Sequence, residues 1–167
     1  MIFIKVSGLK YLLCIIISLL QISCNVNKEF HGNVLTIATY DDIEDWDPGS
    51  AFSLEVLPMS NIYEPLLWFD ASVSPPTMIP ALATSYFVSE NGLRWTFNLR
   101  EHVFFHDGMK FNASVVKYVI DRNKTLKKGP SYIWDYIERV EEDQEYQVSF
   151  YLKSPVALDK IVSSQYG

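Results

Sequence analysis

The chain has 167 residues, a formal net charge of −6 and a pI near 5.0, and 49% of its residues are apolar. This length corresponds to about one domain, and so high an apolar content excludes an intrinsically disordered chain. Because the charge balance is acidic and no basic stripe is visible, the composition also argues against nucleic acid as a partner.

Residues 1–23 have the pattern of an export signal. Lys5 and Lys10 are their only charges, and an apolar run follows from Tyr11 to Leu20. That run is about half of the roughly 20 residues that cross a bilayer, and it fits the apolar region of a signal peptide. Without Lys5 and Lys10 the mature chain has 12 basic and 20 acidic side chains, hence a charge of −8.

A possible lipid attachment site follows the apolar run. The sequence Gln-Ile-Ser-Cys from Gln21 to Cys24 resembles a bacterial lipobox, in which a diacylglycerol is attached to the cysteine. Ser23 and Cys24 fit this pattern, whereas Gln21 stands where leucine is usual. We favour a lipoprotein held to a membrane through Cys24; the alternatives are an ordinary signal peptide and an uncleaved anchor. Residues 24–33 are polar and indicate a tether.

The first part of the mature chain alternates between apolar and polar segments. Val34–Thr39 is β-branched and apolar, which predicts a buried strand. A helix is expected over Phe52–Tyr63, with Leu54, Val56, Leu57 and Ile62 as its apolar positions and Pro58 marking its start or a kink. Leu66–Phe69 is a short apolar strand, and Ala71–Pro80, with three prolines, is a loop.

The segment Tyr40–Ser50 is unusually acidic. Its five carboxylates do not follow the alternating ligand pattern of a calcium-binding loop, so we favour a solvated acidic loop, and Asp47-Pro48-Gly49 indicates a turn. The carboxylates are Asp41, Asp42, Glu44, Asp45 and Asp47.

Two antiparallel strand pairs and two helices are expected in the rest of the chain. Thr84–Glu90 and Leu93–Arg100 flank Asn91-Gly92, a typical hairpin turn, and Trp95, Phe97 and Leu99 share one face of the second strand. The remaining predictions are a short strand at Val103–Phe105, a turn at His106–Gly108, a helix over Ala113–Leu126 capped by Asn112, paired strands at Ile137–Glu142 and Tyr146–Leu152, and a helix over Val156–Ser163.

Three ordered stretches together carry a family resemblance. They are Ile62–Leu66, Pro80–Tyr86 leading through Asn91-Gly92 to Trp95–Arg100, and Val103–Gly108 followed by Phe111-Asn112-Ala113. The set resembles the family 5 extracellular solute-binding proteins of ABC importers, which bind oligopeptides, dipeptides or nickel, and it covers residues 34 to about 152.

The resemblance implies an α/β protein with the two-lobed type II periplasmic-binding-protein fold, of which only the N-terminal part is present. Residues 34–47 would be the first strand and loop of lobe I, residues 48–155 a mixed α+β inserted domain, and residues 156–167 the start of the return to lobe I. The implied function is capture of peptides or similar solutes in the periplasm or at the cell surface. The implied partners are a permease and ATPase subunits. We expect no cofactor and no metal-binding residues in this chain.

Candidate ligand contacts are aromatic residues, since solute pockets combine apolar walls with a few polar groups. The resemblance places the segment from Tyr40 to Val56 near the lobe interface, with Tyr40 and Phe52 as possible walls. It also makes Trp134 a candidate, because an aromatic residue near this point faces the ligand in some relatives. For each of the three, ordinary core or surface packing is the competing interpretation.

Two other classes of function compete with solute import. His102 and His106 would share one face of a strand, a spacing compatible with zinc in a secreted enzyme, although Asp107 would point away. We favour a turn at His106–Gly108, and the chain lacks nucleophile and phosphate-loop signatures. A periplasmic sensor or structural lipoprotein that reuses the fold is the third possibility.

Overall fold

The computed structural model describes residues 35–39, 41–164 and 166 and divides the chain into two units, Met1–Tyr40 and Asp41–Gly167. The strand expected over Val34–Thr39 is not found in the described part of the first unit. Residues 35–39 have no regular structure, and the Leu35 side chain is 83% exposed. A strand is stabilised by pairing its backbone N–H and C=O groups, and an apolar pattern alone does not supply that pairing.

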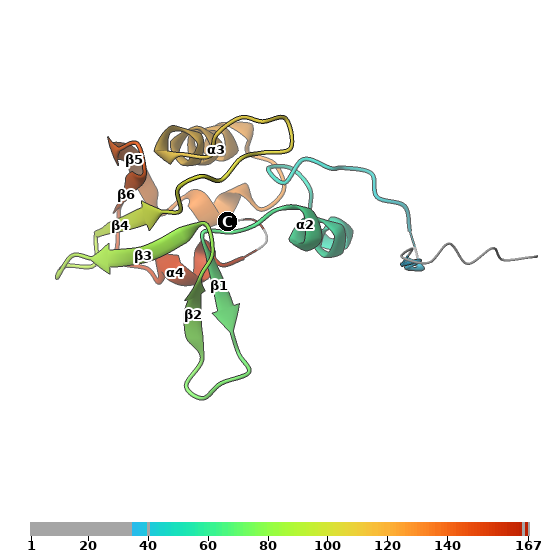
Figure 1. Cartoon of the computed structure of the whole chain (residues 1–167), viewed down its shortest axis with the longest axis horizontal. Helices are drawn as coiled ribbons and strands as arrows, with labels where there is room; N and C mark the ends of the chain where they lie inside the picture. Colours follow the sequence, from blue (N-terminus) through green and yellow to red (C-terminus); the bar gives the residue numbers. More distant parts are fainter. Residues whose placement is uncertain (1–34, 40, 165, 167) are drawn as a thin grey trace, which may run out of the picture. The chain divides into compact units, whose positions relative to one another are not determined.

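The second unit combines helices with two antiparallel sheets (Figure 1). Among the described residues, no helix is long and apolar enough to span a membrane. The elements in chain order are η2 (Ser53–Glu55), α2 (Val56–Ile62), β1 (Leu67–Asp70), β2 (Thr77–Pro80), β3 (Ala83–Val88), β4 (Arg94–Leu99), α3 (Ala113–Leu126), η3 (Ser131–Trp134), β5 (Ile137–Gln144), β6 (Gln147–Leu152) and α4 (Leu158–Ile161).

The larger sheet has the strand order β3-β4-β6-β5 and confirms both predicted strand pairs. Trp95, Phe97 and Leu99 of β4 are buried as expected, and they share the core with Val148 and Phe150 of β6. α3 packs against β5 and β6 and adds Val116 and Ile120 to the same core (Figure 1).

A second, two-stranded sheet projects from the body of the unit (Figure 1). β2 occupies Thr77–Pro80 and pairs with β1, so the loop predicted for the whole of Ala71–Pro80 is wrong over its last four residues. Pro80 is the final residue of a strand in a two-stranded sheet, a position where the missing N–H is tolerated. At the base of this hairpin, Arg100 donates to Glu64 at 2.7 Å.

α2 differs from the expected helix in its start and in its buried face. It begins at Val56, and Pro58 fits because N–H groups of the first turn have no partner within the helix. Met59 is its buried residue, whereas Leu57 and Ile62, two predicted apolar positions, are about half exposed. The apolar pattern of this segment therefore does not correspond to burial within the described residues.

α3 has the predicted bounds and cap. The Asn112 side chain accepts a hydrogen bond from the Val115 N–H at 3.2 Å. The helix ends with Lys127 in the left-handed region, at φ 50°, and Lys124 donates to two carbonyl groups at the start of β5, those of Ile137 and Glu138.

The short segments around α3 are less regular than expected. Val103–Phe105 forms no strand, and a single bridge joins Phe104 to Lys110. The turn at His106–Gly108 is confirmed, with Gly108 at φ 87° and its N–H bonded to the Phe105 carbonyl at 2.9 Å. The last helix, α4, is shorter than the predicted Val156–Ser163.

Candidate functional site

The acidic segment forms a closed turn where it meets α3. The N–H groups of Ser50 and Ala51 donate to the Asp47 carbonyl at 3.0 and 2.7 Å. Asp47 Oδ1 accepts from the Gly49 N–H at 2.9 Å, and Asp45 accepts from the Asp47 N–H at 2.9 Å and from the Ser50 hydroxyl at 2.6 Å. We call residues 45–51 the acidic turn; its shape is set by its own side chains.

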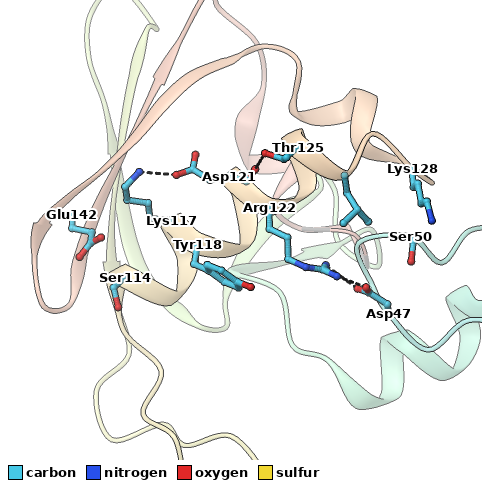
Figure 2. A pocket seen from close by; sticks show the side chains of 11 residues that line it. Asp47, Ser50, Ser114, Lys117, Tyr118, Asp121, Arg122, Thr125, Lys128 and Glu142 are labelled. Atoms are coloured by element: carbon cyan, nitrogen blue, oxygen red, sulfur yellow. Dashed lines mark hydrogen bonds and ion pairs between the residues drawn. The ribbon is translucent and has the colours of Figure 1, made fainter.

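One arginine of α3 fastens the acidic turn to the helix (Figure 2). Arg122 Nη1 donates to Asp47 Oδ1 at 3.0 Å, and Nη2 donates to Oδ2, which makes the ion pair bidentate. The hydrogen bonds from Arg122 lower the pKa of Asp47, and the Gly49 N–H and the charge of Lys128 act in the same direction. The pKa of Arg122 is raised by the same contact. The expected solvated acidic loop is thus anchored at Asp47.

Two glycines permit the close approach of the turn to α3. A methyl group on Gly49 would lie 2.5 Å from Asn123 Oδ1 and 2.6 Å from Arg122 Nη1. A methyl group on Gly129 would lie 2.6 Å from the Ser50 carbonyl oxygen, and Gly129 has a φ of +48°. A side chain at Gly129 would therefore push the turn away from the end of the helix, whereas one at Gly49 would displace the Asn123 and Arg122 side chains.

An open groove runs along α3 beside this contact (Figure 2). It has a volume of about 1000 Å³, and charged and hydroxyl side chains line most of it. Lys117 and Asp121 form an ion pair at 2.7 Å within it, and the Thr125 hydroxyl donates to the Asp121 carbonyl. The lining residues are Asp47, Ser50, Ser114, Lys117, Tyr118, Asp121, Arg122, Thr125, Leu126, Lys128 and Glu142.

A smaller apolar cavity of about 220 Å³ adjoins the groove, because Arg122 lines both. Buried side chains such as Trp134 and Phe150 form its floor, and the partly exposed Tyr63 and Val119 mark its rim. Arg122 thus contributes both to a groove lined by charged and hydroxyl side chains and to a mainly apolar cavity.

Of the predicted ligand contacts, the structure describes Phe52 and Trp134, and they differ in exposure. Phe52 is 54% exposed, and its ring stacks on that of Tyr166, with the ring centroids 6.1 Å apart. Tyr166 in turn lines the cavity whose floor includes Trp134. Trp134 is itself 1% exposed and belongs to the core. Tyr40 and Cys24 lie outside the described residues.

The histidines predicted as possible zinc ligands do not share a strand face. His102 lies in a bend with φ 59°, and its nearest ion-pair partner is Glu101, 4.0 Å away. His106 begins the confirmed turn. Within the described ranges, no three His, Cys, Asp or Glu side chains are grouped closely enough to hold a metal ion.

Arg122 and Tyr166 are the site residues that sequence reasoning missed. Asp47-Pro48-Gly49 indicated the turn, but no local pattern relates residue 47 to a helix 75 positions away. The available signal was Asn123, a polar residue directly after Arg122 that is buried together with Val116 and Ile120, since buried polar groups require partners.

Comparison with known proteins identifies the class of this unit. Its fold is shared with a structure of the ABC transporter-associated periplasmic binding protein DppA from Helicobacter pylori in complex with the peptide STSA, at a TM-score of 0.60 and 26% identity, over 72% of this chain and 27% of that one. The expected mixed helix and strand architecture of a solute-binding protein is thereby confirmed.

Sequence comparison then gives the family. Residues 77–167 match the model of bacterial extracellular solute-binding proteins, family 5 Middle, and the chain belongs to this family. It is 31% identical over 120 residues to the glutathione-binding protein GsiB of Pectobacterium atrosepticum, covering 71% of this chain and 22% of that protein. It is also 31% identical over 177 aligned positions to di/tripeptide-binding protein 2 of Pseudomonas aeruginosa, covering 90% and 31%. The chain spans less than a third of these relatives' lengths.

Proposed function

We propose that the chain supplies part of the substrate-binding component of an ABC-type importer, which captures peptides or similar small solutes outside the inner membrane and delivers them to a permease. The match of residues 77–167 to the family 5 model carries this proposal. Relatives described as glutathione-binding and di/tripeptide-binding support peptides as the solute class. The protein acts by binding, with no catalytic step and no bound metal.

The division into lobes is part of the proposal. Residues 34–47 contribute the first strand and loop of lobe I, residues 48–155 the inserted domain, and residues 156–167 the return to lobe I. The continuous core that joins the larger sheet to α3 supports the inserted domain as a unit. The solute is held as two lobes close over it, and a permease with ATPase subunits receives it.

Phe52 is the strongest candidate for a solute contact, with Tyr40 nearby in the sequence. Its ring is exposed, and it is held against Tyr166 at the cavity rim. Trp134 would meet a solute only from the cavity side, because its side chain is otherwise enclosed by the core. The acidic character of residues 41–47 favours cationic solutes or peptide amino termini.

The proposal includes attachment to a membrane as a lipoprotein. Residues 1–23 are the export signal. Cys24 is the acylated first residue of the mature chain and begins the tether at 24–33. More than one acyl chain is needed for stable anchoring. Cys24→Ala should move the protein from the membrane fraction to the soluble fraction; unchanged membrane association would contradict the lipid anchor.

Competition binding on the complete protein tests the solute class. Dipeptides and tripeptides are expected to bind more tightly than neutral sugars, and stronger sugar binding would contradict the proposal. Permease and ATPase genes adjacent to the coding sequence would favour import over a sensor or structural lipoprotein. Stoichiometric zinc that is lost on His106→Ala would instead favour the enzyme.

A further inference from the structure

We propose that Asp47 is a positioning residue: its ion pair with Arg122 fixes the acidic turn on α3 and, through the turn, sets the place of the Phe52 ring. The relevance to solute capture rests on the function proposed above. The positioning itself is a property of the described residues and can be tested without any solute.

A short series of contacts connects the ion pair to the aromatic ring. The Asp47 carbonyl accepts from the Ala51 N–H at 2.7 Å, and Ala51 is 1% exposed. Phe52 follows directly in an extended conformation, with φ −151° and ψ 142°. Its ring stacks on Tyr166, and the Tyr166 hydroxyl accepts from the Ser53 N–H at 3.3 Å. Moving Asp47 therefore shifts the anchor of Phe52.

The internal hydrogen bonds of the acidic turn give it a shape, whereas the attachment to α3 comes from other contacts. Arg122 supplies two directed hydrogen bonds to Asp47. Gly49 and Gly129 supply close approaches: a methyl group would meet side-chain atoms of Asn123 and Arg122 at Gly49 and the Ser50 backbone at Gly129. The pKa of Asp45 is lowered mainly by the Ser50 hydroxyl and that of Asp47 mainly by Arg122, and the charge of Lys128 adds a smaller attraction to both.

The Asp47–Arg122 ion pair differs from the Arg139–Glu141 pair of β5 in the segments that it joins. Arg139 and Glu141 also meet at 2.7 Å, but they lie two residues apart on β5, and their side chains are about half exposed. Asp47 and Arg122 are 75 residues apart and about one third exposed. Of these two pairs, the second joins a loop to a helix, so its loss, and not that of Arg139–Glu141, should free the acidic turn.

Hydrogen exchange on the whole chain provides the test. Asp47→Asn and Arg122→Met each remove the ion pair while leaving an oxygen at residue 47 to accept from Gly49. We expect the amides of residues 49–53 to exchange about two- to fivefold faster in either variant, with amides of β4 and β6 unchanged. The double variant should exchange no faster than either single one, because both remove the same interaction. Glu141→Gln is the matched control and should leave residues 49–53 unaffected.

Nuclear Overhauser cross-peaks between ring protons of Phe52 and Tyr166 measure whether the Phe52 ring keeps its place. We expect these cross-peaks to weaken in Asp47→Asn and to persist in Glu141→Gln. Unchanged exchange at residues 49–53, equal acceleration of the β4 and β6 amides, or intact ring contacts in Asp47→Asn would each overturn the proposal. Failure of the complete protein to bind peptides would overturn the proposed solute class and leave these results as they stand.

Discussion

Asp47 shows how one carboxylate can serve a turn and a tertiary contact together. Its Oδ1 atom accepts from both the Gly49 N–H and Arg122 Nη1, and its Oδ2 atom accepts from Arg122 Nη2. The turn presents the carboxylate in a fixed direction, so little side-chain entropy remains to be lost when Arg122 binds. This is why a partly exposed ion pair can still hold a loop.

The lowered pKa of Asp47 predicts a pH-dependent contribution to stability. A depressed pKa in the folded state means stabilisation that is present above the unfolded pKa of about 4 and lost as the pH falls through the folded value. Because both side chains are about one third exposed, we expect only about 0.5–1 kcal/mol.

Urea unfolding of the wild type and Asp47→Asn at several pH values measures this contribution. The wild type should be the more stable at pH 6, and the difference should fade as the pH falls from about 4 towards 2. Asp45 also has a lowered pKa, held down by the Ser50 hydroxyl and the Asp47 N–H, which both proteins retain; the charge of Asp47 acts against this, so the Asp45 pKa falls further in Asp47→Asn. A difference that is independent of pH would contradict the assigned cause.

At the scale of elements, the start of α3 depends on one side chain. Asn112 accepts from the Val115 N–H and satisfies a donor that the helix leaves unpaired. Asn112→Ala should lower the free energy of unfolding by about 1 kcal/mol. Asn112→Asp should retain or increase stability, because a carboxylate also accepts this bond and interacts favourably with the helix N-terminus. Chemical denaturation measures both, and equal losses would contradict the capping role.

Gly129, just after the C-terminal end of α3, is expected to tolerate alanine less well than Gly108. Gly108 and Gly129 both have positive φ, so alanine at either position costs about 1 kcal/mol of backbone strain. Gly108 has open space where a methyl group would be, whereas Gly129 faces the Ser50 carbonyl oxygen at 2.6 Å. Gly129→Ala should therefore be the more destabilising by a further 1–2 kcal/mol or so. Equal thermal shifts would show that the turn is not held close to the helix.

Elements with local signals were predictable from the sequence, and those that depend on distant partners were not. The cap at Asn112 and the Asn91-Gly92 turn indicated α3 and the first hairpin with little error. β2 was missed because its pairing with β1 outweighs its proline-rich surroundings. The strand expected at residues 34–39 rests on an apolar pattern alone, and residues 35–39 have no regular structure.

The same distinction applies to the candidate site. The turn at Asp47 was visible in the sequence, because Asp-Pro-Gly is a local turn pattern. Its partner Arg122 and the stacking of Phe52 on Tyr166 were not, because both join segments more than 70 residues apart. Trp134 was weighed as a ligand wall against core packing, and its burial places it in the core of the unit.

At the scale of the whole molecule, the described hollows do not enclose a peptide. The groove along α3 is open, and its charged groups are largely paired with one another. The adjoining cavity, at about 220 Å³, is smaller than the roughly 300–1,000 Å³ of typical ligand sites. Tight binding requires most of the ligand surface to be buried, and Phe52 offers a single exposed wall.

Residues 24–167 alone are therefore expected not to bind dipeptides, tripeptides or glutathione at micromolar concentrations. One wall of a cleft buries too little of the ligand to offset the translational and rotational entropy lost on binding, which is several kcal/mol. Isothermal titration calorimetry with these peptides measures the affinity. Di/tripeptide-binding protein 2 of Pseudomonas aeruginosa, titrated with the same dipeptides and tripeptides, is the positive control for the assay. Micromolar or tighter binding by residues 24–167 would place a complete solute site within this chain, with Phe52 and the cavity beside Tyr166 as the first positions to mutate.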